Sequence, residues 1–143
     1  MILGPPDRIM ALIDPAFTGV DGQTSMLFGY ASGAQAILTC TLFANSPARA
    51  AIVGTEARIE IDGTFYAPSS FTLISREGKR TRFEKPHEGR GLRHQADEVA
   101  RCLRAGLLES PLMPLDESIS IMETMDAVFA QRQAGSLERS NRR

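Results

Sequence analysis

The sequence has almost no net charge, since 16 basic residues stand against 17 acidic ones and give a formal charge of −1. A charge this small creates no field that would attract nucleic acid or an anionic membrane. An apolar run of the roughly 20 residues that a membrane-spanning helix needs is also missing. Residues 1–10 lack a basic start followed by an apolar segment. These absences predict a cytoplasmic protein without nucleic-acid or membrane partners.

Residues that commonly bind metals or act as nucleophiles are scarce. The two cysteines, Cys40 and Cys102, lie far apart and form no CxxC motif, so we expect two buried thiols rather than a disulfide, a redox pair or zinc ligands. His87 and His94 are the only histidines, and no GxSxG motif points to a hydrolase. The sequence therefore predicts no metal site and names no catalytic residue.

What the chain does have is the composition of one globular domain. Of its 143 residues, 43% are hydrophobic and 23% are charged, which suffices for a single core. From Gly135 onward the sequence GSLERSNRR is polar and has no periodic apolar positions. We predict a domain over residues 1–134 and a polar tail over residues 135–143.

Up to Glu84 the sequence alternates short β-compatible runs with turn residues, which indicates a sheet of six or seven strands. Gly33 separates two of these runs where a hairpin could need a positive φ, so their strands should pair antiparallel. The predicted strands are Asp7–Asp14, Gln23–Tyr30, Ala34–Phe43, Arg49–Val53, Ala57–Ile61, Phe71–Ser75 and Thr81–Glu84.

The run from Ala34 to Phe43 has two faces, and neither is strongly charged. One face carries Ala34, Ala36, Leu38, Cys40 and Leu42, and the other carries Gln35, Ile37, Thr39, Thr41 and Phe43. A sheet face in full contact with water usually shows Lys, Glu or Arg. Two interpretations of the Thr/Ile/Phe face stay open: a partner covers it, or it is an ordinary half-exposed surface rich in threonine.

Beyond the strands the apolar period becomes helical. The spacing predicts a first helix over Leu92–Ala105, ended by Gly106, and a second helix with Asp116 as its N-cap. Asp116, Glu117 and Glu123 could suggest paired carboxylates, but acids at a helix N-terminus are favoured by the helix dipole. We therefore interpret these carboxylates as structural.

Four segments taken together resemble the C-terminal domain of the Gfo/Idh/MocA family of NAD(P)-dependent oxidoreductases, the group of glucose-fructose oxidoreductase, inositol dehydrogenase and dihydrodiol dehydrogenase. They occur in the family's order and are Thr18–Asp21, GTEARIEIDGTFYAPSSFTL over 54–73, EVARCLRAGLLESPLMPLDES over 98–118 and METMDAV over 122–128. The resemblance implies an α+β fold, an open, mainly antiparallel β-sheet with helices packed on one face. The other face commonly joins subunits, which implies a homo-oligomer.

The resemblance also implies that the N-terminal Rossmann domain of the family is missing. Family members bind NAD or NADP at a glycine-rich turn of that domain, and this sequence contains no GxGxxG. NAD or NADP is thus implied for the full-length enzyme, whereas this chain alone is expected to bind no cofactor. The family's catalytic Glu-Lys-Pro motif precedes the sheet, so Glu84-Lys85-Pro86, which follows the predicted strands, is interpreted as a chance match.

In the resemblance, the loop before the first helix lies towards the substrate cleft, which makes Arg93 and His94 candidates for lining it. A solvated charged loop is the other interpretation. The implied function is that of a C-terminal domain whose enzyme acts on a sugar, a polyol or a related hydroxyl or carbonyl substrate. The domain would contribute cleft walls and an oligomer interface and be inactive alone. The alternative is a free-standing dimeric binding or scaffold module.

Overall fold

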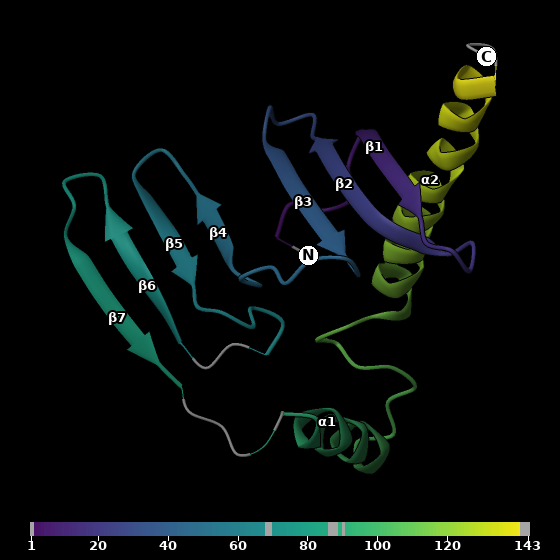
Figure 1. Ribbon diagram of the computed structural model, residues 1–143. Coiled ribbons are helices and arrows are strands. Elements are labelled where there is room, and N and C mark those ends of the chain that lie inside the picture. The colour runs from purple at the N-terminus through teal and green to yellow at the C-terminus, as the bar shows by residue number, and fades with distance from the viewer. Residues whose placement is uncertain (1, 68–69, 86–88, 90, 141–143) are drawn as a thin grey trace. The chain divides into compact units, whose positions relative to one another are not determined.

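The computed structural model describes residues 2–67, 70–85, 89 and 91–140, and Figure 1 shows its strands and helices. Seven strands come first in these residues, and two helices follow them. The chain divides into two compact units: Met1–Asn45 together with Glu109–Arg143 form unit 1, and Ser46–Leu108 form unit 2. No helix of the described residues is long and apolar enough to cross a bilayer.

Unit 1 contains a sheet of three antiparallel strands. They are β1 (Arg8–Pro15), β2 (Asp21–Gly29) and β3 (Gln35–Thr41), with β2 in the centre. The turn between β2 and β3 is closed by a hydrogen bond from the Gly33 amide to the Tyr30 carbonyl, and Gly33 has a φ of 84°. The predicted hairpin and its need for glycine are thus confirmed.

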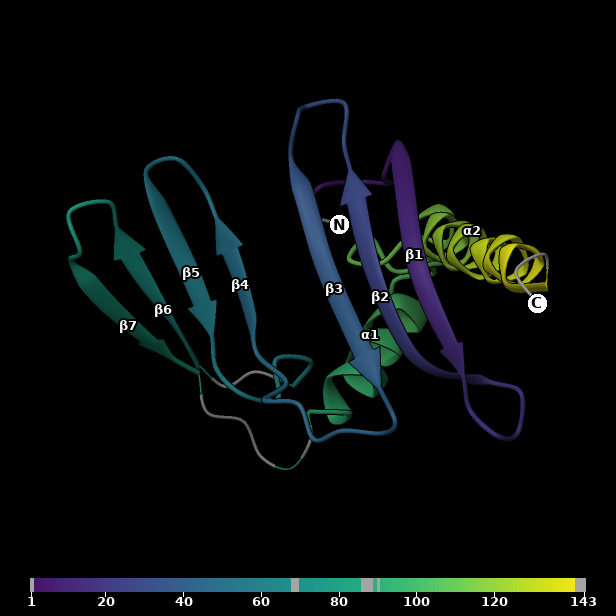
Figure 2. The same ribbon diagram turned by 45° about the horizontal axis from the view of Figure 1, so that its top comes forward.

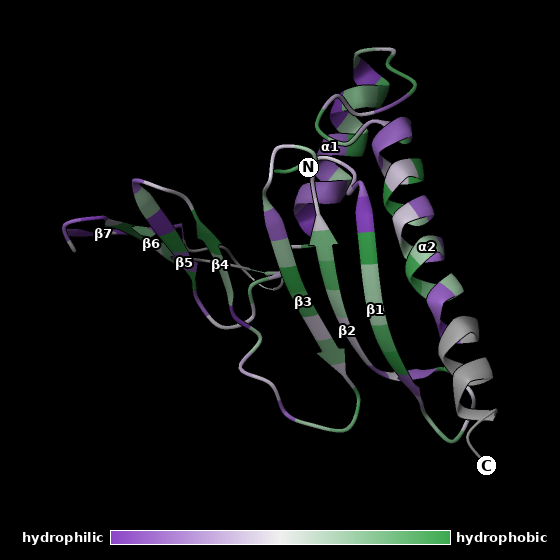
Figure 3. Ribbon diagram, turned by 90° about the horizontal axis from the view of Figure 1, so that it is seen from above, coloured by the Kyte–Doolittle hydropathy of each residue, from purple (hydrophilic) through white to green (hydrophobic). Residues whose placement is uncertain are grey.

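The long helix α2 (Leu115–Ser140) packs along β1 within this unit, and Figures 2 and 3 show it beside that strand. Side chains alternate along β1, since Ile13 is 5% exposed whereas its neighbours on either side are exposed. Val128 of α2 is buried as well. Unit 1 therefore has a core on the helix side of its sheet and leaves the opposite sheet face uncovered.

Unit 2 contains a sheet of four antiparallel strands and the helix α1 (Arg93–Arg104). Its strands, in spatial order, are β4 (Ala50–Val53), β5 (Ala57–Ile61), β6 (Ser70–Ser75) and β7 (Arg80–Glu84). One sheet face is apolar and includes the stacked rings of Phe71 and Phe83, whose centroids are 4.8 Å apart. The other face carries charged side chains over the buried Ile74.

The α+β class and the antiparallel pairing predicted from the sequence are confirmed. The strands belong to two sheets rather than to one continuous ladder, because residues 42–49 between β3 and β4 are irregular and Ala48 has a φ of 45°. The helix α2 begins at Leu115, so Asp116 lies in its first turn and is not the N-cap. Its backbone runs to Ser140, and the division of domain and tail at Gly135 stays a prediction.

The expectation of two buried thiols is half wrong. Cys102 of α1 is buried, but Cys40 of β3 is exposed. Cys40 lies on the helix-facing side of its sheet, where α2 packs along β1 and leaves part of β3 open. A strand's alternation tells which face a residue belongs to, and it does not tell how far a helix covers that face.

Candidate functional site

Unit 1 contains an apolar cavity of about 330 Å³ between the inner face of the sheet and α2. Strands β2 and β3 form its floor and α2 forms one wall, while Gly4 and Pro6 of the segment before β1 also line it. The lining residues are Gly4, Pro6, Asp21, Thr24, Met26, Phe28, Tyr30, Leu38, Cys40, Ile121, Thr124, Met125, Val128 and Phe129. A cavity of this character holds apolar groups.

Few polar atoms reach this cavity. Thr24 is 3% exposed, and its hydroxyl has no hydrogen-bond partner in the part of the chain that the structure describes. The described residues that line the cavity include Asp21 but no histidine, lysine or arginine. General acid–base catalysis needs a proton donor or acceptor poised at the reacting atom. Asp21, Tyr30 and Cys40 carry the ionisable groups among the lining residues, and the rest of the lining is largely apolar.

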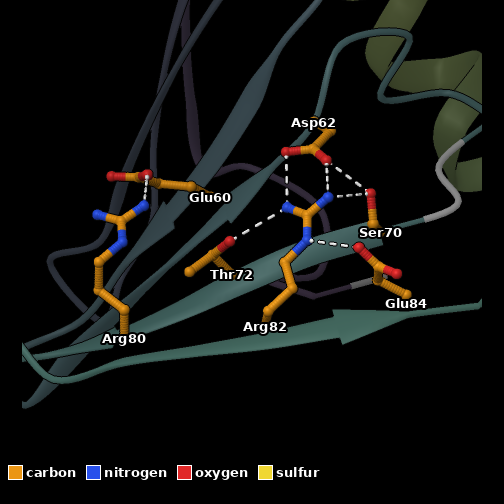
Figure 4. Close-up of polar contacts among 7 residues, drawn as sticks. All are labelled: Glu60, Asp62, Ser70, Thr72, Arg80, Arg82 and Glu84. Atoms are coloured by element: carbon orange, nitrogen blue, oxygen red, sulfur yellow. Dashed lines mark hydrogen bonds and ion pairs between the residues drawn. The ribbon is translucent and has the colours of Figure 1, made fainter.

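A dense polar cluster lies in unit 2, on the charged face of its sheet (Figure 4). The Arg82 guanidinium donates from Nη1 to Asp62 Oδ1 at 3.1 Å and to Thr72 Oγ1 at 3.2 Å. Its Nη2 pairs with the other Asp62 oxygen and donates to Ser70 Oγ at 2.7 Å. Ser70 in turn donates to Asp62 at 2.6 Å. Arg82 thereby ties β7 to the end of β5 across β6.

These contacts fix the charge state of the cluster. The hydrogen bond from Arg82, followed by that from Ser70, lowers the pKa of Asp62 to about 2. Arg58 donates to Glu60 at 2.8 Å, and this bond is the first cause of the lowered Glu60 pKa. Since hydrogen bonds to the ionised carboxylates favour the charged form, both remain negative at neutral pH.

The cluster is a structural feature and not an acid–base site. Its carboxylates titrate far below neutral pH, and each faces an arginine of a neighbouring strand or of its own strand. Among the residues that the structure describes, no group of three His, Cys, Asp or Glu side chains could hold a metal ion. The arrangement can stabilise the edge of the sheet but offers no reactive group to a substrate.

The two predicted cleft residues are the first two residues of α1. Arg93 and His94 are both exposed, and the His94 amide donates to the Gly91 carbonyl at 3.1 Å in the turn that starts the helix. Their role towards a substrate stays a prediction. His87 and Pro86 lie outside the described residues, while Lys85 of the rejected tripeptide is exposed.

Sequence reasoning missed the ionic cluster, although a signal for it was present. Arg58 and Glu60 alternate along β5, Asp62 follows at the same spacing directly after it, and Arg80, Arg82 and Glu84 alternate along β7. Each set lies on one face by the period of a strand. Only the register, which pairs Glu60 with Thr72 and Thr72 with Arg82, brings the two sets together. The cavity has no comparable sequence signal.

No protein-family model matches the chain. Individual proteins do match it. The chain is 35% identical over 122 residues to the trans-1,2-dihydrobenzene-1,2-diol dehydrogenase of Xenopus tropicalis, a match covering 80% of this chain and 36% of that protein. To the enzyme of the same description from Danio rerio it is 33% identical over 138 residues, covering 91% of this chain and 40% of that protein. The chain thus spans about two fifths of these relatives.

Two solved structures share the fold. The aldose-aldose oxidoreductase of Caulobacter crescentus aligns with a TM-score of 0.75 at 19% identity, over 92% of this chain and 40% of that one. A UDP-N-acetylglucosamine 3-dehydrogenase of Acidithiobacillus ferrooxidans aligns with a TM-score of 0.60 at 15% identity, over 72% of this chain and 33% of that one. These structures show the shared fold alone, whereas the sequence relatives show that the chain is homologous to part of the dihydrodiol dehydrogenases, which are enzymes of the Gfo/Idh/MocA type.

Proposed function

We propose that this chain is the sheet-bearing C-terminal domain of an NAD(P)-dependent oxidoreductase that acts on a sugar, a polyol or a related hydroxyl or carbonyl substrate. The observation that carries the proposal is the coverage: 80% of this chain corresponds to only 36% of a dehydrogenase. That share is typical of one domain of a two-domain enzyme. The dinucleotide and the acid–base groups would then reside on further sequence.

The chemistry of hydride transfer supports this division of labour. The reaction needs a nicotinamide held against a substrate carbon and a group that exchanges a proton with the substrate oxygen. The ionic cluster offers no such group, because Arg82 and Ser70 hold Asp62 in its ionised form. The domain's contribution would be to shape the substrate cleft and to join subunits.

Arg93 and His94 are our proposed contributors to the cleft wall. Both are exposed at the start of α1, the segment that the family resemblance places towards the substrate cleft. In the full-length enzyme, Arg93→Ala and His94→Gln should raise KM while kcat is largely retained, because binding and not proton transfer is lost. A collapse of kcat at unchanged KM would instead make one of them a catalytic residue.

The uncovered face of the β1–β2–β3 sheet is our proposed oligomer interface. Met10, Leu12, Leu27 and Ile37 all lie on it and are exposed, and Ile37 is 84% exposed. Between them lie Ser25 and Thr39, which are uncharged. At about 25 cal/mol per Å² such a surface is costly to leave in water. By contrast, the solvated face of the β4–β7 sheet carries charged side chains.

The same apolar face also suits the second candidate, a free-standing dimeric module without enzymatic activity, because self-association needs no cofactor. The upstream nucleotide sequence separates the two functions. An in-frame segment that encodes a glycine-rich βαβ unit would identify part of an enzyme. A stop codon in frame directly before Met1 would favour the free-standing module.

A binding experiment tests the enzyme proposal directly. The purified 143-residue chain should neither bind NADH or NADPH tightly, by fluorescence titration, nor oxidise a trans-dihydrodiol or a sugar with NAD or NADP. The polypeptide extended by the upstream segment should bind NADH or NADPH tightly and should oxidise one of these substrates. Turnover by the short chain alone would overturn the proposal, as would an extended polypeptide that binds neither nucleotide.

A further inference from the structure

The outer edge of β1 is closed by one side chain of α2. Among the residues that the structure describes, the strand order β1-β2-β3 leaves one side of β1 without a neighbouring strand. Gln131 lies along that side: its Nε2 donates to the Ile9 carbonyl at 2.6 Å, and its Oε1 accepts from the Ala11 amide at 2.8 Å. Both bonds are partly buried and join residues more than a hundred positions apart. Figure 3 shows α2 running beside β1.

This pair of bonds has the pattern of a strand. In a parallel sheet, one residue of a strand donates its N–H to the carbonyl of residue i−1 on its neighbour and accepts from the N–H of residue i+1. The Gln131 amide does both for Ile9 and Ala11, on either side of Met10. It therefore occupies the hydrogen-bonding position that one residue of a further strand would take.

Without Gln131, the edge of β1 would be open to pairing with another chain. Exposed edges of long apolar strands are templates for pairing with another chain, and β1 has eight residues, with Met10 and Leu12 exposed on one face. Between Arg8 and Asp14 no charged residue interrupts it. An uncovered amide and carbonyl at its centre would invite an extended segment.

We propose that Gln131 is a surrogate strand residue that closes the edge of β1 against strand addition by a second copy of the chain. While α2 is docked, copies can associate through the sheet face but not through this edge. When the Gln131 contact is lost, the Ile9–Ala11 edge becomes an interaction site for an extended strand, with β1 of another copy as the self-complementary partner.

Hydrogen exchange of the Ala11 amide tests the closure. Gln131→Met keeps the length and the helix propensity of the side chain but removes both bonds, so the Ala11 amide should exchange about tenfold faster or more, as expected for one lost hydrogen bond. Gln131→Glu retains an acceptor and should keep Ala11 slow. Equal Ala11 exchange in the wild type and in Gln131→Met would overturn the closure.

The exchange of a second amide in the same sheet distinguishes local opening of the β1 edge from global destabilisation. The Leu38 amide of β3 lies in the same sheet, away from this edge, and its exchange should stay unchanged in Gln131→Met. Ile13→Val, which loosens the core, should accelerate both amides alike if exchange occurs by unfolding. Acceleration of Ala11 and Leu38 by the same factor in Gln131→Met would reduce Gln131 to an ordinary stabilising residue and overturn the proposal.

Sedimentation tests the partner. The background variant is Ile37→Lys, which places a charge on the sheet face. Adding Gln131→Met to it should produce species larger than those of Ile37→Lys alone at micromolar concentration. Adding Gln131→Glu should produce fewer of these larger species than Gln131→Met does. Because the face is charged in all these variants, growth reports on the edge alone. Identical sedimentation with and without Gln131→Met would exclude the second copy as the occupant.

Discussion

Arg82 contacts both carboxylate oxygens of Asp62 across the width of a strand, with Nη1 at 3.1 Å from Oδ1 and Nη2 on Oδ2. The two residues are 20 positions apart in the sequence, and Ser70 of the intervening strand bonds to both. Such forked pairs are geometrically specific. Both side chains are nearly half exposed, so solvent screening limits their contribution to stability. The pair mainly fixes the position of β7 against the end of β5.

The pH dependence of stability should reveal this pair. The folded-state pKa of Asp62 is lowered from 3.8 to about 2 by Arg82 and then Ser70. The ionised carboxylate therefore stabilises the fold above about pH 4, and this contribution is lost as the pH falls towards 2. Asp62→Asn should have a lower free energy of unfolding than the wild type at pH 7, and this free energy should fall less between pH 4 and pH 2. The free energy is measured by urea unfolding at each pH, and an equal fall in both proteins would contradict this.

Charge on the open sheet face should weaken self-association. Ile37 is 84% exposed on that face, and Val53 is 75% exposed on the charged face of the other sheet. Ile37→Lys should shift the sedimentation of the chain at micromolar concentration towards monomer, because a buried unpaired ammonium is costly. Val53→Lys is the matched control and should leave the distribution unchanged. A wild-type chain that is monomeric at these concentrations would refute the interface.

The core of unit 1 should respond to the loss of a single methylene. Ile13 is 5% exposed, so Ile13→Val should lower the free energy of unfolding by ~1 kcal/mol. The same substitution at Ile37, which is 84% exposed, should change it by less than about 0.5 kcal/mol. Chemical denaturation of both variants measures the difference. Equal losses would mean that the two faces of the sheet are buried to the same extent.

The hairpin between β2 and β3 should depend on the backbone of Gly33 and not on the space around it. No atom lies within 4 Å of a Cβ added there, but the φ of 84° is unfavourable for a side chain. Gly33→Ala should cost about 1 kcal/mol, and Gly33→Asn should cost less, because asparagine tolerates this conformation better. Thermal unfolding of both variants gives the order, and a reversed order would contradict the argument.

The strands were predictable because the period-two alternation and the turn residues are both local signals. Ala57–Ile61 has the predicted bounds, and Ile37 and Thr39 are both exposed on one face of β3, as the alternation predicted. The covering of that face by a partner stays a prediction. The third strand ends at Thr41, however, and the Phe43 ring lies so close to Gly22 that a Cβ there would come within 2.3 Å. Phe43 therefore leaves the row predicted for it.

The remaining features depend on contacts between distant parts of the chain. The irregular segment that divides the strands into two sheets contains Ala48 at positive φ, a conformation that is uncommon for alanine and that its presence in the sequence does not predict. The bonds from Gln131 to β1 bridge 120 residues or more. No periodicity encodes such a pairing, and the register that joins Asp62 to Arg82 is equally invisible until the strands are aligned.

Unit 2 lies between the two sequence segments of unit 1, so these two segments are synthesised at different times. Unit 1 is built from residues before Ser46 and after Leu108, so its first strand is made long before the helix that flanks it. On the ribosome, β1 must wait for some 120 further residues before Gln131 emerges. Throughout that interval the nascent strand lacks the Gln131 bonds, so we expect its edge to be open to aggregation during translation.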